Sequence, residues 1–281
     1  MALPTAPDGS TPARTVTTGT GSTDVRAVVF DYGGVLTTPV RDSIAAWLAA
    51  DGIRPESFSR VLKAWLSRSA PEGTPIHRLE TGTLPPEEFE RLVAAELETH
   101  DGSPVVAEGL LTRLFAGMRP DPAMTALVRE VRALGLRTVL LSNSWGNIYP
   151  RALLAELFDG TVISGEVGLR KPDPRIYRLA LDLAGVPAAQ AVFVDDAVPN
   201  TDGALAVGMR AVHHVDAATT RGRLAELIPG LRRTATGQPP DRSAASPGHP
   251  RSGDPARPGT DPGSGAGAGA DGHRKADPPR P

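Results

Sequence analysis

Short apolar runs alternate with helical segments in this sequence, and this alternation limits the available folds more strongly than any other feature. Runs typical of buried strands occur at 26–30, 138–141, 161–163, 191–194 and 211–215. Helical periodicity separates most of them, and the last two helices are predicted over 200–207 and 221–227. Strands joined in this way form a parallel sheet through right-handed crossovers. We therefore predict an α/β fold with a doubly wound, Rossmann-like parallel sheet.

A long helical block interrupts the alternation directly after the first strand. Apolar residues recur in it at helical spacing, and one stripe runs from Phe58 to Trp65. No run in this block alternates as a strand would, so residues 39–118 are predicted to form an all-helical insertion. The core domain then consists of 24–38 and 119–234. Four aromatic residues of the insertion are expected in its interior: Trp47, Phe58, Trp65 and Phe89.

The two ends of the chain differ in composition from the rest. In residues 237–281, 19 of 45 residues are Gly or Pro, and none is Val, Ile, Leu, Met, Phe, Trp or Tyr. Such a segment buries too little apolar surface to offset the entropy that ordering removes. We predict disorder for 235–281. We predict it also for 1–23, which is rich in Thr, Gly, Pro and Ser and lacks the apolar centre of a secretory signal.

Charge and residue content exclude several classes of function. The net charge is −2 and basic residues do not cluster, which argues against a nucleic acid or an acidic membrane as a partner. No apolar stretch of the sequence approaches the length of a membrane-spanning helix. The chain has no cysteine, which rules out disulfides, thiolate catalysis and Cys-ligated metals. We expect a cytoplasmic protein, and the sequence leaves its oligomeric state open.

Four polar clusters stand where predicted strands end or helices begin. They are Asp31 with the glycine pair after it, Ser142-Asn143, Lys171-Pro172 and Asp195-Asp196. Taken singly, such residues more often form turns or helix caps than functional sites. The carboxyl ends of parallel strands, however, lie at one edge of the sheet, where such folds bind ligands. We therefore expect the four clusters to converge on one pocket.

With these clusters in this order, the sequence resembles the haloacid dehalogenase-like superfamily, specifically its phosphatases with a helical cap. The resemblance extends over most of residues 25–230 and implies a cap inserted after the first strand. It implies that Asp31 is the nucleophile and that Lys171 pairs with both the nucleophile and the phosphate. It also implies that Ser142, helped by the backbone N–H of Asn143, holds the phosphoryl oxygens.

The adjacent carboxylates of Asp195 and Asp196 favour a bound metal on chemical grounds. They would repel each other without a counter-ion, and hard oxygen ligands suit Mg²⁺ better than Zn²⁺. By the resemblance, Asp196 is the better direct ligand, joined by Asp31 and the backbone carbonyl of Gly33. Asp195 is either a further ligand or, together with Asn200, an orienting group. The sequence leaves these two roles of Asp195 open.

One position departs from the family pattern. Most of these phosphatases carry a second Asp two residues after the nucleophile, as the general acid and base, and that position is Gly33 here. Loss of a general acid typically lowers the rate by about 10²–10⁴. Three alternatives follow. In the first, the leaving group of the substrate needs little protonation, as in anomeric or acyl phosphates. In the second, the substrate or a water molecule relays the proton. The third alternative is a phosphate site that has lost turnover.

The sequence predicts a Mg²⁺-dependent phosphatase that hydrolyses a small, sugar-phosphate-like metabolite through an aspartyl-phosphate. A 2-haloacid dehalogenase of the same fold is a weaker alternative, because its reaction needs no metal and the acidic pair would only add repulsion near the nucleophile. A second alternative is a phosphate-binding or partner-binding protein without activity. Gly33 is the residue that supports it best.

The resemblance also implies that cap residues facing the pocket determine which substrate is bound. Substrate choice is expected to depend on Thr38, Arg41 and the loop Glu80-Thr81-Gly82, and Trp145 is expected near the mouth of the pocket. Arg170 is interpreted as structural or at the surface. His213 and His214 lie in a late strand, one facing the core and one the opposite side, and neither is given a catalytic role.

Overall fold

The computed structural model describes residues 24–67, 70–146 and 149–231. The strands are β1 (Ala27–Phe30), β2 (Arg137–Ser142), β3 (Gly160–Ile163), β4 (Ala191–Asp195) and β5 (Arg210–His213). The helices before β2 are α1 (Val40–Ala50), α2 (Pro55–Leu66), α3 (Pro75–Glu80), α4 (Pro86–Glu96), α5 (Leu110–Phe115) and α6 (Pro122–Ala133). Those after β2 are α7 (Arg151–Leu157), α8 (Ser164–Val167), α9 (Pro174–Ala184), the short 3₁₀ helix η1 (Ala188–Gln190), α10 (Val198–Ala206) and α11 (Ala217–Leu227).

The sheet confirms the predicted doubly wound fold. Its five strands are parallel and follow the order β3-β2-β1-β4-β5. The chain builds outward from β1 to β3 and then crosses to β4 on the other side of β1. In such sheets the ligand site lies at this reversal, beyond the carboxyl ends of the strands. The predicted disorder of 1–23 and 235–281 concerns residues outside those that the structure describes.

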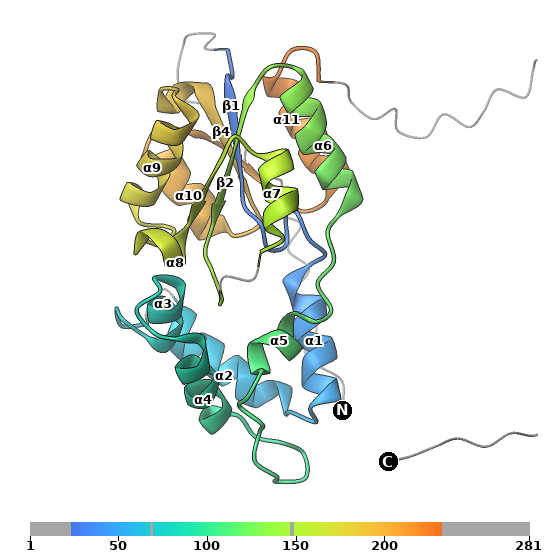
Figure 1. Ribbon diagram of the computed structural model, residues 1–281, viewed down its shortest axis with the longest axis vertical. Helices are drawn as coiled ribbons and strands as arrows, with labels where there is room; N and C mark the ends of the chain where they lie inside the picture. Colours follow the sequence, from blue (N-terminus) through green and yellow to red (C-terminus); the bar gives the residue numbers. More distant parts are fainter. Residues whose placement is uncertain (1–23, 68–69, 147–148, 232–281) are drawn as a thin grey trace, which may run out of the picture. The chain divides into compact units, whose positions relative to one another are not determined.

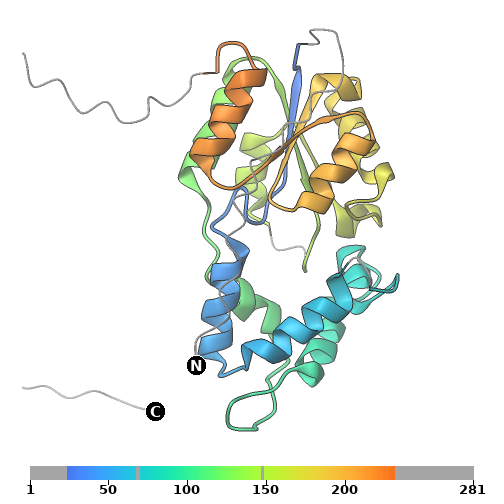
Figure 2. The ribbon, with the colours of Figure 1, turned by 180° about the vertical axis from the view of Figure 1, so that it is seen from behind.

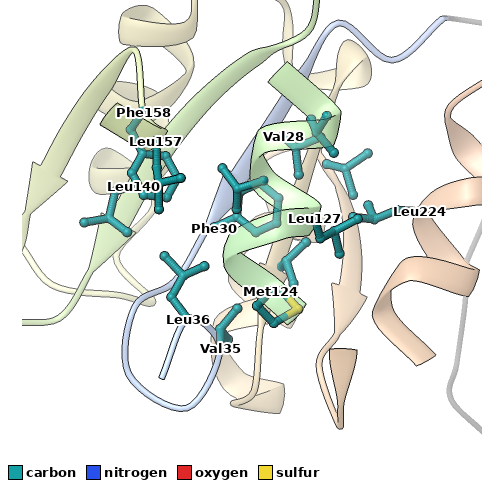
Figure 3. Packing of buried hydrophobic residues seen from close by; sticks show 14 of the residues in the cluster. Val28, Phe30, Val35, Leu36, Met124, Leu127, Leu140, Leu157, Phe158 and Leu224 are labelled. Carbon is teal, nitrogen blue, oxygen red and sulfur yellow. The ribbon is translucent and has the colours of Figure 1, made fainter. Parts of the chain in front are cut away.

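Helices cover both faces of the sheet. α6, α7 and α11 lie on one face, and α9 and α10 lie on the other (Figures 1 and 2). Phe30 of β1 packs against Met124 and Leu127 of α6, with Leu224 of α11 in the same cluster (Figure 3). All four residues of β1 are buried, as expected for a central strand covered on both faces. This packing fixes the strand that carries Asp31 at its end.

Helices α1–α5, here called the helical insert, lie beyond the carboxyl ends of the strands (Figure 1). Trp47, Phe58 and Phe89 are buried in the insert's own apolar cluster, and Trp65 is half-buried against it, as expected. The two chain segments that link the insert to the sheet pair with each other. Thr38 N–H donates to the Arg119 carbonyl at 2.8 Å, and Asp121 N–H donates to the Leu36 carbonyl at 2.8 Å. The helical insertion is thus confirmed, while its exact domain boundaries, 39–118, stay a prediction.

The last strand and the last helix of the described chain differ from their predicted bounds. The last strand ends at His213 rather than at 215, and α11 begins at Ala217 rather than at 221. The physical reason is a helix cap: the Asp216 carboxylate accepts a hydrogen bond from the Thr219 backbone N–H at 2.7 Å. Apolar periodicity is weak in this first turn, so the cap rather than the pattern marks the start. Within the described residues, no helix has the length and apolar character needed to cross a bilayer.

Candidate active site

Three of the four predicted clusters meet around the ammonium group of Lys171. Lys171 Nζ lies 2.8 Å from Asp31 Oδ1 and 2.6 Å from Asp195 Oδ2. Asp31 directly follows β1, Asp195 ends β4, and Lys171 reaches them from the loop before α9. The lysine side chain is only 1% exposed, so its charge is neutralised by these carboxylates rather than by water.

Burial and the neighbouring charges shift the pKa values of both Asp31 and Lys171. Burial raises the pKa of Asp31 to about 7 and outweighs the attraction of Lys171, which lowers that pKa; Asp195 and Asp196 add smaller increases. Burial alone would lower the pKa of Lys171, but the carboxylates of Asp195 and Asp31 outweigh it and raise that pKa. The ammonium therefore stays charged at neutral pH. Additional positive charge beside Asp31 would favour its ionised, nucleophilic form.

Asp31, Asp195 and Asp196 form an acidic cluster that fits a divalent cation. Each offers a carboxylate oxygen, and these oxygens lie within 4.8 Å of one another. Burial raises the pKa of Asp196, and the charge of the neighbouring Asp195 raises it further. A bound cation would relieve this repulsion between the two carboxylates. An oxygen-only set of this kind suits Mg²⁺. The chemistry of the donors therefore fits the predicted metal.

The two adjacent aspartates differ in what they contact. Asp195 is fully buried and accepts hydrogen bonds from the Ala197 backbone N–H at 2.8 Å and from Asn200 Nδ2 at 3.0 and 3.1 Å, besides its pairing with Lys171. Asp196 is the exposed member of the cluster. This favours Asp195 as the orienting group and Asp196 as a direct metal ligand.

The glycine pair after Asp31 has two different structural roles. Gly34 has a φ of +76°, and a Cβ there would collide with the Asp196 carboxylate. A side chain at Gly34 would therefore displace a predicted ligand. Gly33 has space around it, since a Cβ there would meet only Val40 Cγ2 at 3.4 Å.

Ser142 ends β2, Asn143 directly follows it, and their side chains have different partners. The Ser142 hydroxyl accepts a hydrogen bond from the Tyr149 phenol at 3.0 Å. The Asn143 side chain brackets the backbone of Lys171: its Oδ1 accepts from Lys171 N–H at 2.8 Å, and its Nδ2 donates to the Lys171 carbonyl at 3.2 Å. Asn143 thus holds the lysine loop in place through its side chain, and its predicted phosphate contact stays a prediction.

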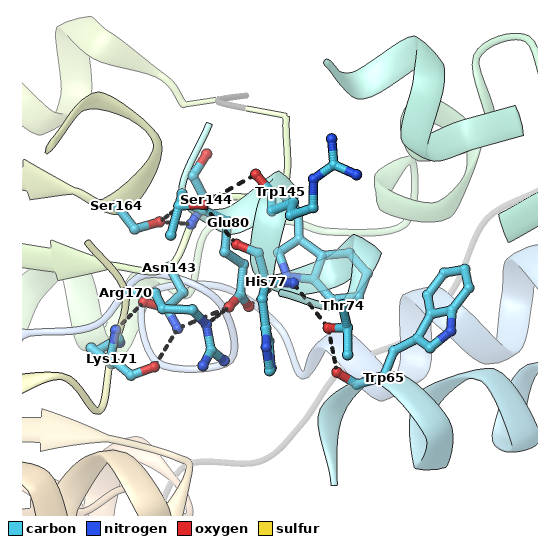
Figure 4. A network of polar contacts seen from close by, with 12 residues as sticks. Trp65, Thr74, His77, Glu80, Asn143, Ser144, Trp145, Ser164, Arg170 and Lys171 are labelled. Atoms are coloured by element: carbon cyan, nitrogen blue, oxygen red, sulfur yellow. Dashed lines mark hydrogen bonds and ion pairs between the residues drawn. The ribbon is translucent and has the colours of Figure 1, made fainter. Parts of the chain in front are cut away.

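Glu80, the last residue of α3, links the helical insert to the loops of the site (Figure 4). Its carboxylate is 6% exposed and accepts hydrogen bonds from Trp145 Nε1 at 2.9 Å, from Arg170 Nε and from Asn143 Nδ2 at 3.4 Å. Its backbone carbonyl accepts a hydrogen bond from the Ser164 hydroxyl at the start of α8. One residue of the insert is therefore bound by groups from three different segments of the α/β core.

A cavity of about 1040 Å³ lies between the helical insert and the strand ends, with Asp31, Ser142 and Lys171 in its wall. Trp145 lines it as predicted, and so does Glu80 of the predicted loop, whereas Thr81 and Gly82 of that loop are not among its described lining residues. Two other residues proposed for substrate choice are placed elsewhere. Thr38 bonds to Arg119 in the linking segments, and Arg41 has an 86% exposed side chain beside Asp42; neither is among the described residues that line the cavity.

Several cavity-lining residues were not predicted from the sequence, and Tyr149, Arg170 and His77 are three of them. Tyr149 contacts Ser142, and burial raises its pKa to about 12, so its phenol stays protonated at neutral pH. Arg170 lines the cavity as the partner of Glu80, and its place next to Lys171 in the sequence was the available signal. His77 lies on α3, where burial and the Arg170 charge lower its pKa. No sequence pattern indicated that its side chain lines the cavity.

Of the two late histidines, only His213 lies in β5 as predicted; His214 follows the end of the strand. His214 is buried and bonds through Nδ1 to the Thr220 hydroxyl at 2.8 Å. His213 Nε2 lies 2.9 Å from the Asp196 backbone carbonyl, on the exposed side. The contact beside Asp196 was not anticipated, although neither histidine lines the cavity described above.

Comparison with known proteins adds three findings. A family model described as haloacid dehalogenase-like hydrolase matches residues 25–208. Phosphatase MT3486 of Mycobacterium tuberculosis is 31% identical over 199 residues, which are 66% of this chain and 86% of that protein. The sesquiterpene phosphatase AstK of Aspergillus oryzae is 27% identical over 214 residues, which are 73% of this chain and 98% of that protein.

A solved structure shares the fold. The HAD family enzyme BT-2542 from Bacteroides thetaiotaomicron, in a magnesium complex, superposes with a TM-score of 0.53 at 19% identity. The match covers 68% of this chain and 94% of that one. At this identity the likeness concerns the fold alone.

Proposed function

The chain belongs to the haloacid dehalogenase-like hydrolases, and from that premise we propose that it is a Mg²⁺-dependent phosphatase of a phosphorylated small molecule. One observation carries the proposal: Asp31 lies in a cavity wall with a buried ammonium group 2.8 Å away and two further carboxylates beside it. A carboxylate attacks a phosphate anion poorly in water, because the two repel each other. Positive charge and hydrogen-bond donors around the site offset that repulsion.

The proposed reaction has two steps. Asp31 attacks phosphorus, the bond to the ester oxygen breaks, and the alcohol leaves after taking up a proton. Water then attacks the aspartyl-phosphate, which releases inorganic phosphate and restores the carboxylate. Lys171 offsets negative charge at Asp31 and at the phosphate, while Asp195, Asn200 and Asn143 hold the lysine and its loop. Bound Mg²⁺, held by Asp31, Asp196 and the Gly33 carbonyl, would supply the remaining neutralising charge.

Relatives support this proposal through their printed names. MT3486 and AstK are named phosphatases. A crystal structure of BT-2542 contains magnesium and inorganic phosphate. The acidic cluster of this chain offers the oxygen ligands that such a cation requires. A sugar-phosphate-like substrate stays a prediction from the sequence.

Metal removal is the direct test of the proposed activity. With Mg²⁺ present, we expect phosphate release from p-nitrophenyl phosphate and from at least some alkyl or sugar phosphates. After treatment with EDTA the rate should fall at least about 10²-fold, since the attacking and attacked groups then repel each other. Adding Mg²⁺ back should restore it, whereas Ca²⁺, which is larger and less strict in geometry, should restore less. Phosphate binding without turnover of any ester would favour the non-enzymatic alternative.

Gly33 supplies a second test, because the structure leaves space for a side chain there. Gly33→Asp is expected to raise kcat on alkyl phosphates by at least about tenfold, since a positioned general acid typically contributes about 10²–10⁴. The gain on p-nitrophenyl phosphate should be smaller, because p-nitrophenolate leaves without a proton. Gly33→Asn has nearly the same size and no acidic proton, and should give no gain. Equal gains from both variants would show that the effect is not proton transfer.

A further inference from the structure

The cavity that holds Asp31, Ser142 and Lys171 is otherwise lined mostly by apolar side chains. We propose that the substrate is a phosphate monoester of a large apolar alcohol, whose hydrocarbon part occupies this cavity while the phosphate contacts Asp31, Ser142 and Lys171. The inference rests on the proposed phosphatase function and names the substrate class of the same site. Its occupant follows from continuity, because one cavity holds both the reacting groups and the apolar wall.

Apolar side chains line the cavity from both sides. The helical insert and the segment after it contribute Val40, Ile44, Leu62, Leu66, Phe115 and Met118. The core contributes Trp145, Tyr149 and Pro150. Trp145 packs edge-to-face against Phe115 and Phe89 of the insert, with ring centroids 6.3 and 5.8 Å apart, and so joins the two halves of this wall. Such a lining binds hydrocarbon through burial of apolar surface.

Apart from the His77 imidazole and the Tyr32 phenol, the ionisable side chains of the described cavity wall form polar contacts with one another or with Ser142. Asp31 pairs with Lys171, and Arg170 pairs with Glu80. The Asn143 amide bonds to the Lys171 backbone and to Glu80, and the Asn200 amide bonds to Asp195. A sugar needs donors and acceptors along its whole length, and a site built for one would aim such groups at it. Here these polar groups stabilise the site itself.

The volume of the cavity also favours a large apolar substrate. At about 1040 Å³ the cavity is at the upper end of the range for small-molecule sites, about 300–1,000 Å³. A phosphate with a short polar group would leave much of the apolar wall in contact with water. Burying that wall against a long or polycyclic hydrocarbon gives the favourable term that a short substrate lacks.

A homologous series of alkyl phosphates tests the inference. Ethyl, butyl, hexyl and octyl phosphate share the same bond to phosphorus and leave as alcohols of similar acidity, so the missing acid at Gly33 affects all of them alike. We expect kcat/KM to rise by up to about fourfold for each added methylene. The rise should come from a lower KM with little change in kcat, because the alkyl chain of the substrate is bound equally in the ground state and in the transition state. Glucose 6-phosphate should react no better than ethyl phosphate.

Two leucines of the insert provide a matched pair of variants. Leu66 on α2 is 37% exposed and lines the cavity, whereas Leu92 on α4 is 38% exposed and is not among its described lining residues. Leu66→Gln is expected to lower the octyl-to-ethyl ratio of kcat/KM at least about fivefold, since it places a polar amide against the chain. Leu92→Gln should leave that ratio unchanged. Melting temperatures of both variants check that the fold is retained.

Each outcome has a definite meaning. A rising chain-length series that Leu66→Gln flattens supports the inference. Mg²⁺-dependent turnover with no chain-length dependence, or with glucose 6-phosphate as the better substrate, overturns it and leaves the phosphatase proposal intact. No Mg²⁺-dependent turnover of any ester, p-nitrophenyl phosphate included, overturns the proposed function itself.

Discussion

Asp31→Asn is expected to reduce phosphate release at least about 10⁴-fold, because removal of a nucleophile typically has an effect of this size. The amide has the shape of the carboxylate but cannot attack phosphorus. Folding should be little affected, since burial and the neighbouring carboxylates already raise the pKa of Asp31 to about 7. The measurement is kcat on p-nitrophenyl phosphate at saturating Mg²⁺, together with the melting temperature.

Asp196→Asn is the matched control for this loss. Asp196 belongs to the same acidic cluster but lies at its exposed side. Removing its charge should weaken Mg²⁺ binding by about 10–100-fold, an effect that higher Mg²⁺ concentrations should largely overcome. Asp31→Asn should not recover in this way. If Asp31→Asn kept more than about one hundredth of the kcat, a different group would have to be the nucleophile.

Lys171→Met is expected to destabilise the fold by about 3–5 kcal/mol, the range for removing one partner of a buried ion pair. Asp31 and Asp195 would then lie buried beside each other without the ammonium that now contacts both at 2.8 and 2.6 Å. Turnover should fall at least about 10²-fold in addition, because charge at the phosphate is no longer offset. Urea unfolding and initial rates measure the two effects separately.

Arg175→Met, four residues further along, is a suitable control. Its guanidinium also forms an ion pair at 2.6 Å, with Asp173, but its side chain is 66% exposed. Exposed pairs of this kind contribute about 0–1 kcal/mol. The two variants should therefore differ by at least about 2 kcal/mol in the free energy of unfolding. Similar losses would mean that the burial of Lys171 does not determine its contribution.

Periodicity and strand ends made most of the fold predictable from the sequence. The alternation of apolar runs gave the five strands, and the family match confirms the resemblance drawn from the four polar clusters. The proximity of Asp31, Asp195 and Lys171 could be predicted because the carboxyl ends of parallel strands lie at one edge of the sheet. The start of α11 was missed, since the Asp216 cap acts where apolar periodicity is weak.

The contacts of the helical insert were not predictable in the same way. Glu80 and Arg170 are 90 residues apart in the sequence, and no periodicity links them. Thr38 and Arg41 were proposed for substrate choice as cap residues that would face the site, yet they lie in or beside the linking segments. Which side chains of a helix line a cavity depends on how that helix packs against another part of the chain. That information lies in three-dimensional contacts rather than in local pattern.

Glu80 ties access to the cavity to the alignment of the reacting groups. Its carboxylate accepts from Asn143 Nδ2, and the same amide holds the backbone of Lys171. Moving α3 outward to admit a molecule would break the contact with Asn143 and loosen the loop that aims the ammonium. An open form would therefore have its lysine loop less firmly held, and closure over a bound ester would restore both the covered cavity and the position of the ammonium group.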